Sequence, residues 1–244
     1  MKLALRWIGT LWGAWLLVGC AGLAPKEADM NAAYHGAIAD SAVASPSKVV
    51  PLRALPSGES VTMVSWVVAT RVPCKASEVP CDMKVGKDPM WVTLAGEVQG
   101  LCSRWNLAGD ALRRRMEQLL GLPIDPPDQY RKAMVVEMQV PRDRLQRPCL
   151  GLDESDPGRP KCTIDAQATT PIELRNFVGQ QMAGAYVVDN PRGPGYPFTR
   201  LGYTYDWAPN AHPKHYGASE FLVAPGTAMV ATRVVTTDAY CNVP

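Results

Sequence analysis

Residues 219–235 read SEFLVAPGTAMVATRVV, and this stretch indicates the fold more clearly than any other part of the chain. Its two halves, SEFLVA (219–224) and TAMVATRVV (227–235), are rich in apolar and β-branched residues, which is typical of β-strands. Pro225-Gly226 lies between them and is a strong turn signal. The stretch therefore predicts two strands separated by a turn.

Further strand and helix patterns precede this stretch. Strand character is found in residues 60–72, 90–94, 132–140 and 200–207. Helix character is found in residues 97–105, in the segment that opens at Gly109-Asp110 and ends at Gly121, and in residues 171–188. The order of these elements, with no internal repeat, predicts a single α+β domain over residues 59–244. Its sheet is expected to be mainly antiparallel, with the helices packed on one face.

The first twenty residues, MKLALRWIGTLWGAWLLVGC, have the layout of a secretory signal. The apolar segment is short for a membrane-spanning helix, although an uncleaved anchor is the alternative. It ends in Leu17-Val18-Gly19-Cys20, which resembles a bacterial lipobox. The resemblance implies cleavage of a signal peptide, residues 1–19, and lipidation of Cys20. Ala21-Gly22 follows in place of the Asp that commonly retains lipoproteins at the inner membrane. This implies sorting to the outer membrane, with the protein facing the periplasm.

The segment that follows the lipobox is poor in large apolar residues. Residues 21–58 are rich in Ala, Ser and Pro and have no convincing helical or strand pattern. Residues 20–58 are therefore expected to form a lipidated, flexible tether. On this interpretation Tyr34 and His35 belong to the tether and not to a functional site.

The charge balance excludes one class of partner. The full chain has a formal net charge of +2, and Lys2 and Arg6 are the only charged residues before Cys20. The chain from Cys20 onward therefore carries equal numbers of acidic and basic residues. Proteins that bind nucleic acid through its phosphates normally have a basic excess, so no nucleic-acid partner is expected. The lipid, rather than net charge, is expected to hold the protein at the membrane.

Six cysteines remain when Cys20 is set aside. An even number in an exported chain predicts three disulfide bonds, although six cysteines allow several pairings. Cys74 and Cys81 could close a small loop, and Cys149 and Cys162 could staple a long turn. Cys102 with Cys241 would then tie the early helical region to the C-terminus. Because no pair has CxxC spacing, no cysteine metal site is expected.

Residues 190–220 contain most of the candidate functional side chains. A hydrolase would use His212 or His215 as base, Asp206 to orient it and Arg200 to stabilise an anion, with Glu220 nearby. A metal site would use the two histidines with Asp206 or Glu220, but Pro213 separates the histidines, so their spacing guarantees no common direction. No established catalytic signature is present.

The same region also allows a reading without catalysis. Alternation in RLGYTYDW (200–207) places Tyr203, Tyr205 and Trp207 on one strand face. Such a face either covers a sheet edge or forms a binding surface for glycan or protein.

LRRRMEQLLGLP (112–123) together with YPFTRLGYTYDW and SEFLV (196–223) resembles a group of exported bacterial proteins without an assigned activity. The resemblance implies a shared fold and shared disulfides, and brings no catalytic residues. We expect a non-enzymatic accessory or binding module, without cofactor or metal, whose partner is an envelope protein or cell-wall glycan. The alternative is a cell-envelope hydrolase that uses the cluster of residues 200–220.

Overall fold

The computed structural model describes residues 27–188, 194–211 and 214–242. Its main sheet contains β1 (Ser60–Val67), β2 (Cys81–Lys84), β3 (Met90–Leu94), β4 (Met134–Pro141), β5 (Leu145–Gln146), β8 (Tyr203–Tyr205), β9 (Tyr216–Val223) and β10 (Ala228–Thr236). A separate ribbon pairs β6 (Leu152–Asp153) with β7 (Lys161–Cys162). The helices are α1 (Glu27–Ala42), α2 (Ala95–Cys102), α3 (Gly109–Leu119), α4 (Ile172–Ala185) and α5 (Thr237–Cys241). None of the helices in these ranges combines the length and apolar character needed to cross a membrane.

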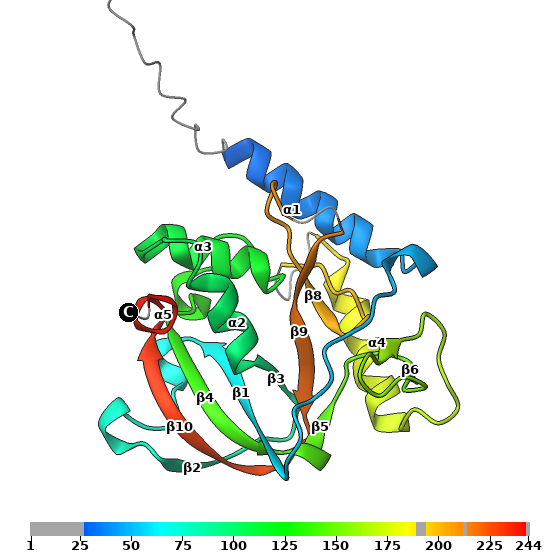
Figure 1. Cartoon of the computed structure of the whole chain (residues 1–244). Helices are drawn as coiled ribbons and strands as arrows, with labels where there is room; N and C mark the ends of the chain where they lie inside the picture. The colour runs from blue at the N-terminus through cyan, green and yellow to red at the C-terminus, as the bar shows by residue number, and fades with distance from the viewer. Residues whose placement is uncertain (1–26, 189–193, 212–213, 243–244) are drawn as a thin grey trace, which may run out of the picture.

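The main sheet is antiparallel, with strand order β2-β10-β4-β1-β3-β9-β5, and β8 pairs with β9. β9 and β10 are consecutive in sequence, joined through Pro225-Gly226, yet β4, β1 and β3 lie between them in the sheet. Figure 1 shows the chain passing beneath the sheet from β9 to β10. The predicted turn is thus present, and it links two strands that are not neighbours in the strand order of the curled sheet. The predicted α+β class with a mainly antiparallel sheet is confirmed.

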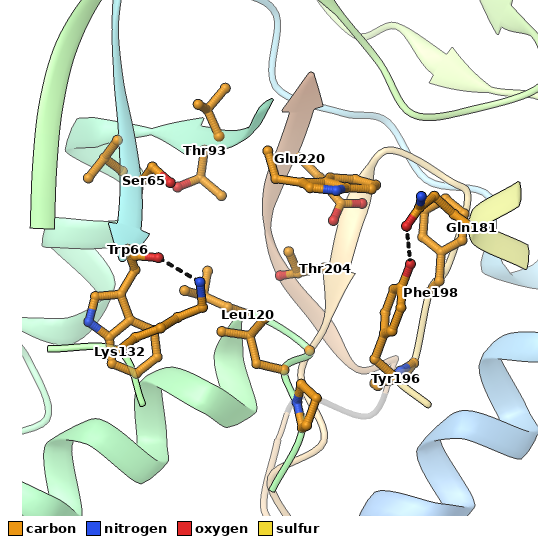
Figure 2. Close-up of a pocket in the computed structure, with 17 residues that line it drawn as sticks. Ser65, Trp66, Thr93, Leu120, Lys132, Gln181, Tyr196, Phe198, Thr204 and Glu220 are labelled. Atoms are coloured by element: carbon orange, nitrogen blue, oxygen red, sulfur yellow. Dashed lines mark hydrogen bonds between the residues drawn. The ribbon is translucent and has the colours of Figure 1, made fainter. Parts of the chain in front are cut away.

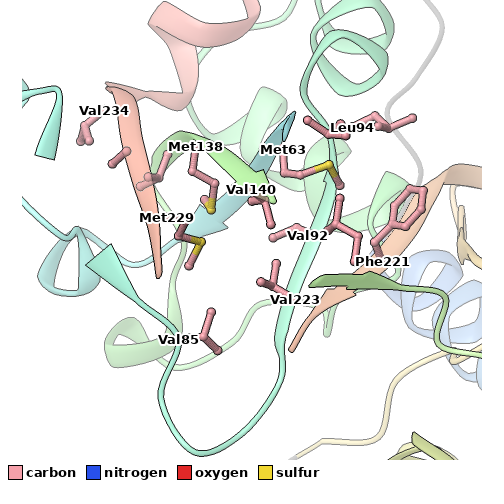
Figure 3. Packing of buried hydrophobic residues seen from close by; sticks show 14 residues of the cluster. Met63, Val85, Val92, Leu94, Met138, Val140, Phe221, Val223, Met229 and Val234 are labelled. Carbon is pink, nitrogen blue, oxygen red and sulfur yellow. The ribbon is translucent and has the colours of Figure 1, made fainter. Parts of the chain in front are cut away.

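Side-chain alternation gives the sheet two buried faces. In β1, Val61 and Met63 point into an apolar cluster shared with β4, β9 and β10, whereas Val64 and Trp66 point to the opposite face. Figure 3 shows this cluster, in which Met63, Met138 and Met229 lie among branched side chains. Because side chains alternate along a strand, both faces must be covered to exclude water.

Two groups of helices cover the face that carries Val64. α2, α3 and α5 pack on Val64 and Trp66, and the Cys102–Cys241 disulfide joins α2 to α5. α4 packs farther along the same face, where Leu222 of β9 meets Leu174 and Val178. The helices therefore share one face of the sheet, as expected, but leave a space between the two groups.

The three disulfides are Cys74–Cys81, Cys102–Cys241 and Cys149–Cys162, which confirms the pairing favoured by the sequence. The longest bridge spans 139 residues and fixes the C-terminal helix against the first helix of the domain core. In the chain-entropy model, the bridge that closes the longest loop lowers the conformational entropy of the unfolded chain the most and therefore stabilises the fold the most.

The expected flexible tether over residues 20–58 is wrong for its described part, because residues 27–42 form helix α1 and pack on the domain. Tyr34, Ala37 and Ile38 are buried against Tyr205 and Trp207. Figure 1 shows α1 lying beside β8. Local sequence pattern does not predict this helix, because its apolar stripe is narrow and short and its stability comes from tertiary contact.

Candidate functional site

The sheet opens between β1 and β3. Pairing between these strands ends at Val64 opposite Thr93, although β1 continues to Val67 and β3 begins at Met90. Within the described sheet, the end of β1 and the start of β3 therefore do not pair with each other. A cavity of about 290 Å³ lies at this opening, which we call the β1–β3 cleft.

The walls of the cleft are mainly apolar and aromatic. Trp66, Leu120 and Leu122 line it on the side of α3, and Trp91 and Phe198 line it on the side of α4. The Trp91 and Phe198 rings meet edge to face, with centroids 5.7 Å apart. Aromatic walls with a few polar groups are typical of small-ligand sites.

Gly121 lies in the segment after α3 that lines the cleft. Its φ is +61°, a conformation that side chains with a Cβ rarely adopt, and it ends α3 as the sequence predicts. A Cβ at this position would lie 3.2 Å from the backbone oxygen of Tyr205. The turn at Gly121 therefore brings Leu122 and Pro123 to the cleft.

Glu220 is the most unusual side chain in the cleft. It lies on β9 opposite Thr93, and its Oε2 is shielded from solvent without a hydrogen-bond partner among the described residues. Burial raises the pKa of Glu220 to about 8, and the nearby Arg147 guanidinium partly opposes this rise. The carboxyl is thus mostly protonated at pH 7.

Lys132 and Tyr196 supply further polar atoms, which Figure 2 shows around the cleft. Lys132 Nζ donates to the Trp66 carbonyl oxygen at 2.8 Å, and burial, with a smaller contribution from Arg71, lowers its pKa to about 8. The Tyr196 hydroxyl donates to Gln181 Oε1 at 2.6 Å, and burial raises its pKa above the ordinary value. The cleft therefore carries both an acidic and a basic group.

A second cavity of about 820 Å³ adjoins the first. The two share five lining residues: Ser65, Trp91, Leu122, Pro123 and Lys132. Glu117 of α3 lines the second cavity and is 2% exposed. Its Oε1 accepts from Arg113 Nη1 at 2.6 Å, whereas its Oε2 has no partner in the described part of the chain. Burial raises the pKa of Glu117 in spite of Arg113.

The structure does not assemble the hydrolase cluster expected from the sequence. Both carboxylate oxygens of Asp206 accept from Arg115, at 2.9 and 2.6 Å, so Asp206 is a buried ion-pair partner. His215 stacks on Tyr205, and its Nδ1 lies 2.9 Å from the backbone oxygen of Asp206, not from its carboxylate. Asp206 therefore does not orient His215 as a catalytic base would require.

The remaining members of that cluster lie elsewhere. Arg200 donates to the carbonyl oxygen of Ala42 at the end of α1, and Glu220 lies in the β1–β3 cleft, which His215 does not line. His212 lies outside the described residues. Among the residues that are described, no three His, Cys, Asp or Glu side chains gather as a metal site would require.

The expected aromatic binding surface is also wrong. Tyr203, Tyr205 and Trp207 are only 5, 6 and 1% exposed, because α1 and the segment after it cover them. Only Tyr203–Tyr205 of the expected strand over residues 200–207 forms β8, and residues 201–208 are buried on both faces. These aromatics therefore serve packing, as the sheet-edge alternative foresaw.

The cleft joins residues that sequence reasoning did not combine. Glu220 was a candidate, but its companions Lys132, Trp91 and Glu117 come from different elements. One signal was available: alternation in SEFLVA places Glu220 on the same strand face as Leu222, where an acid is unexpected. Comparison of the chain with protein-family models, curated proteins and solved structures finds no match.

Proposed function

We propose that this protein is an outer-membrane lipoprotein, anchored through Cys20 and facing the periplasm, that binds a cell-wall fragment in the β1–β3 cleft. The lipobox and the Ala21-Gly22 that follows it support the anchor and its location. The function is binding without catalysis, and it needs no cofactor.

The observation that carries the binding proposal is the opening of the sheet between β1 and β3. An ordinary antiparallel pair would continue its ladder, whereas here two tryptophans and a buried carboxyl surround a cavity. The shape favours a small ligand over an envelope protein, because a stable protein interface buries about 800 Å² on each partner. The adjoining second cavity provides room for a short chain rather than a single sugar or amino acid.

The position of α1 supports a location close to the membrane. With residues 27–42 folded onto the domain, six residues separate Cys20 from α1, and six extended residues span about 20 Å. A lipid at Cys20 would then hold the domain near the membrane surface. A Cys20→Ser variant should leave the membrane fraction, and retention of that variant in the membrane would contradict the anchor.

Binding can be measured with the full lipoprotein purified in detergent. Soluble muropeptides, the disaccharide-peptide fragments of cell wall, should change the fluorescence of Trp66 and Trp91 in a saturable way. Ser65→Phe fills the cleft and should abolish the change. Ser60→Phe, an exposed position on the same strand, is the matched control and should not. Absence of saturation with the unaltered protein at millimolar ligand would refute the proposal.

A further inference from the structure

We propose that the ligand is recognised through its peptide: primary ammonium groups are bound by Glu220 and Glu117, and a carboxylate between them is bound by Lys132. This inference rests on the proposed binding function and specifies the chemistry of the ligand. It separates a cell-wall peptide released from its sugar, which has a free N-terminal amine, a free amine on its diamino acid and carboxylates, from the neutral sugar chain.

Two buried carboxyls, each with one oxygen that accepts no hydrogen bond from the described residues, carry the inference. Within the described residues, Oε2 of Glu220 and Oε2 of Glu117 are both shielded from solvent and both lack a hydrogen-bond partner. Each side chain lines one of the two adjoining cavities. A buried polar atom without a partner is costly and uncommon, and a ligand that donates hydrogen bonds there removes the penalty. The two atoms therefore mark two donor positions on the ligand.

The donors are ammonium groups because a carboxyl accepts most strongly as an anion. A ligand cation beside Glu220 favours its ionised form and gives a charge-assisted hydrogen bond, which is about twice as strong as a neutral one. Aromatic rings line the same cleft and suit a cation better than a hydroxyl. The positive groups around the two acids do not remove this preference, since Oε2 of each acid accepts no hydrogen bond from any described residue.

The charged groups that face each acid are known. Arg147 lies near Glu220, and its guanidinium donates hydrogen bonds to the backbone oxygens of Gly202 and Glu220. Lys132 lines the same cleft as Glu220. Arg113 donates a hydrogen bond to Oε1 of Glu117. The charge of Asp125 raises the pKa of Glu117, and the charge of Arg114 lowers it. No described arginine pairs with either Oε2.

Lys132 fixes the position of the carboxylate. It is one of the residues that line both cavities. Its Nζ makes one hydrogen bond, to the Trp66 carbonyl, and an ammonium has three donors. The site thus presents acid, base and acid in sequence, which complements a chain with amine, carboxylate and amine.

The test compares the cell-wall peptide released from its sugar with the same peptide after acetylation of its two free amines. Acetylation removes both positive charges and leaves the carboxylates in place. The full lipoprotein in detergent should bind the acetylated peptide at least tenfold more weakly. Equal affinity for the two peptides, or binding of muropeptides without binding of either peptide, would overturn this inference and leave the proposed function standing. Absence of binding by both peptides and by muropeptides would overturn both.

Variants then locate the amine. Glu220→Gln should weaken binding of the untreated peptide about tenfold and leave binding of the acetylated peptide unchanged. Glu173→Gln, on the exposed start of α4, is the matched control. Glu117→Gln should have an effect similar to that of Glu220→Gln, and a fluorescence-monitored melt verifies folding of each variant. Full retention of amine preference in a folded Glu220→Gln protein would contradict the role of Glu220.

Discussion

Glu220→Gln should stabilise the protein when no ligand is added, by an amount that grows with pH. The pKa of Glu220 rises from 4.5 to about 8 on folding, because burial disfavours the charged form. Between these two values the folded protein holds a proton that the unfolded chain has released. Stability from this group is therefore complete below pH 4.5 and is lost progressively as pH rises towards 8. Glutamine does not titrate, so the variant escapes the loss.

The magnitude follows from the interval between the two pKa values. Each pH unit inside the interval changes the free energy of unfolding by about 1.4 kcal/mol. Relative to the unaltered protein, the free energy of unfolding of the variant should be higher by about 3 kcal/mol at pH 7 and by about 5 kcal/mol above pH 8, and should be unchanged near pH 4. These figures are upper values, because the Glu220 residue as a whole is only half-buried, although its Oε2 is shielded from solvent.

Urea unfolding of both proteins with their disulfides intact, at pH 4, 5.5, 7 and 8.5, measures the difference. Glu173→Gln is again the control and should show no pH-dependent gain. A difference between Glu220→Gln and the unaltered protein that stays constant from pH 4 to 8.5 would refute the argument. Such a result would mean that the carboxyl ionises normally and that the cleft holds it in water. A gain in stability that accompanies weaker ligand binding is expected for a residue kept for function.

Three other perturbations test the packing. Asp206→Asn leaves a guanidinium without its partner and should lower the free energy of unfolding by about 3 kcal/mol, with muropeptide affinity unchanged; loss of affinity without loss of stability would point back to a role in the site. Tyr34→Ala removes a buried ring that joins α1 to the domain and should destabilise by about 3 kcal/mol in a thermal melt, and an unchanged Tm would restore the tether interpretation. Serine replacement of Cys102–Cys241 should cost about 5 kcal/mol and that of Cys74–Cys81 about 2.5 kcal/mol in urea unfolding, so equal losses would contradict the loop-length argument.

The regular elements of the core were accessible from local patterns. β1, β3, β4, β9 and β10 were expected within a few residues of their bounds, because each of them is rich in apolar, aromatic or β-branched residues. α3 was expected from Leu112, Met116 and Leu119 on one face, and Gly121 ends it. Helix α1 was missed because its few apolar residues make a helix only when Trp207 and Tyr205 cover them.

The candidate site was much less accessible. Residues near in sequence, such as Asp206, His215 and Glu220, were grouped as one cluster, yet a strand sends successive side chains to opposite faces. The ion pair of Asp206 with Arg115 joins residues 91 positions apart, which no local pattern contains. The cleft likewise depends on where the pairing of β1 with β3 ends.

The export signal at the N-terminus stays a prediction. The sequence by itself determined the α+β class, the identity of most strands and helices, and a disulfide pairing that the structure confirms. Each of these depends on residues close together in the chain or on simple counting. Only the tertiary structure decided that α1 folds onto the domain, that the expected aromatic surface is buried, and that Glu220, Glu117 and Lys132 line two joined cavities. Those features arise from strand order and packing between distant segments, for which burial, and not local preference, supplies the free energy.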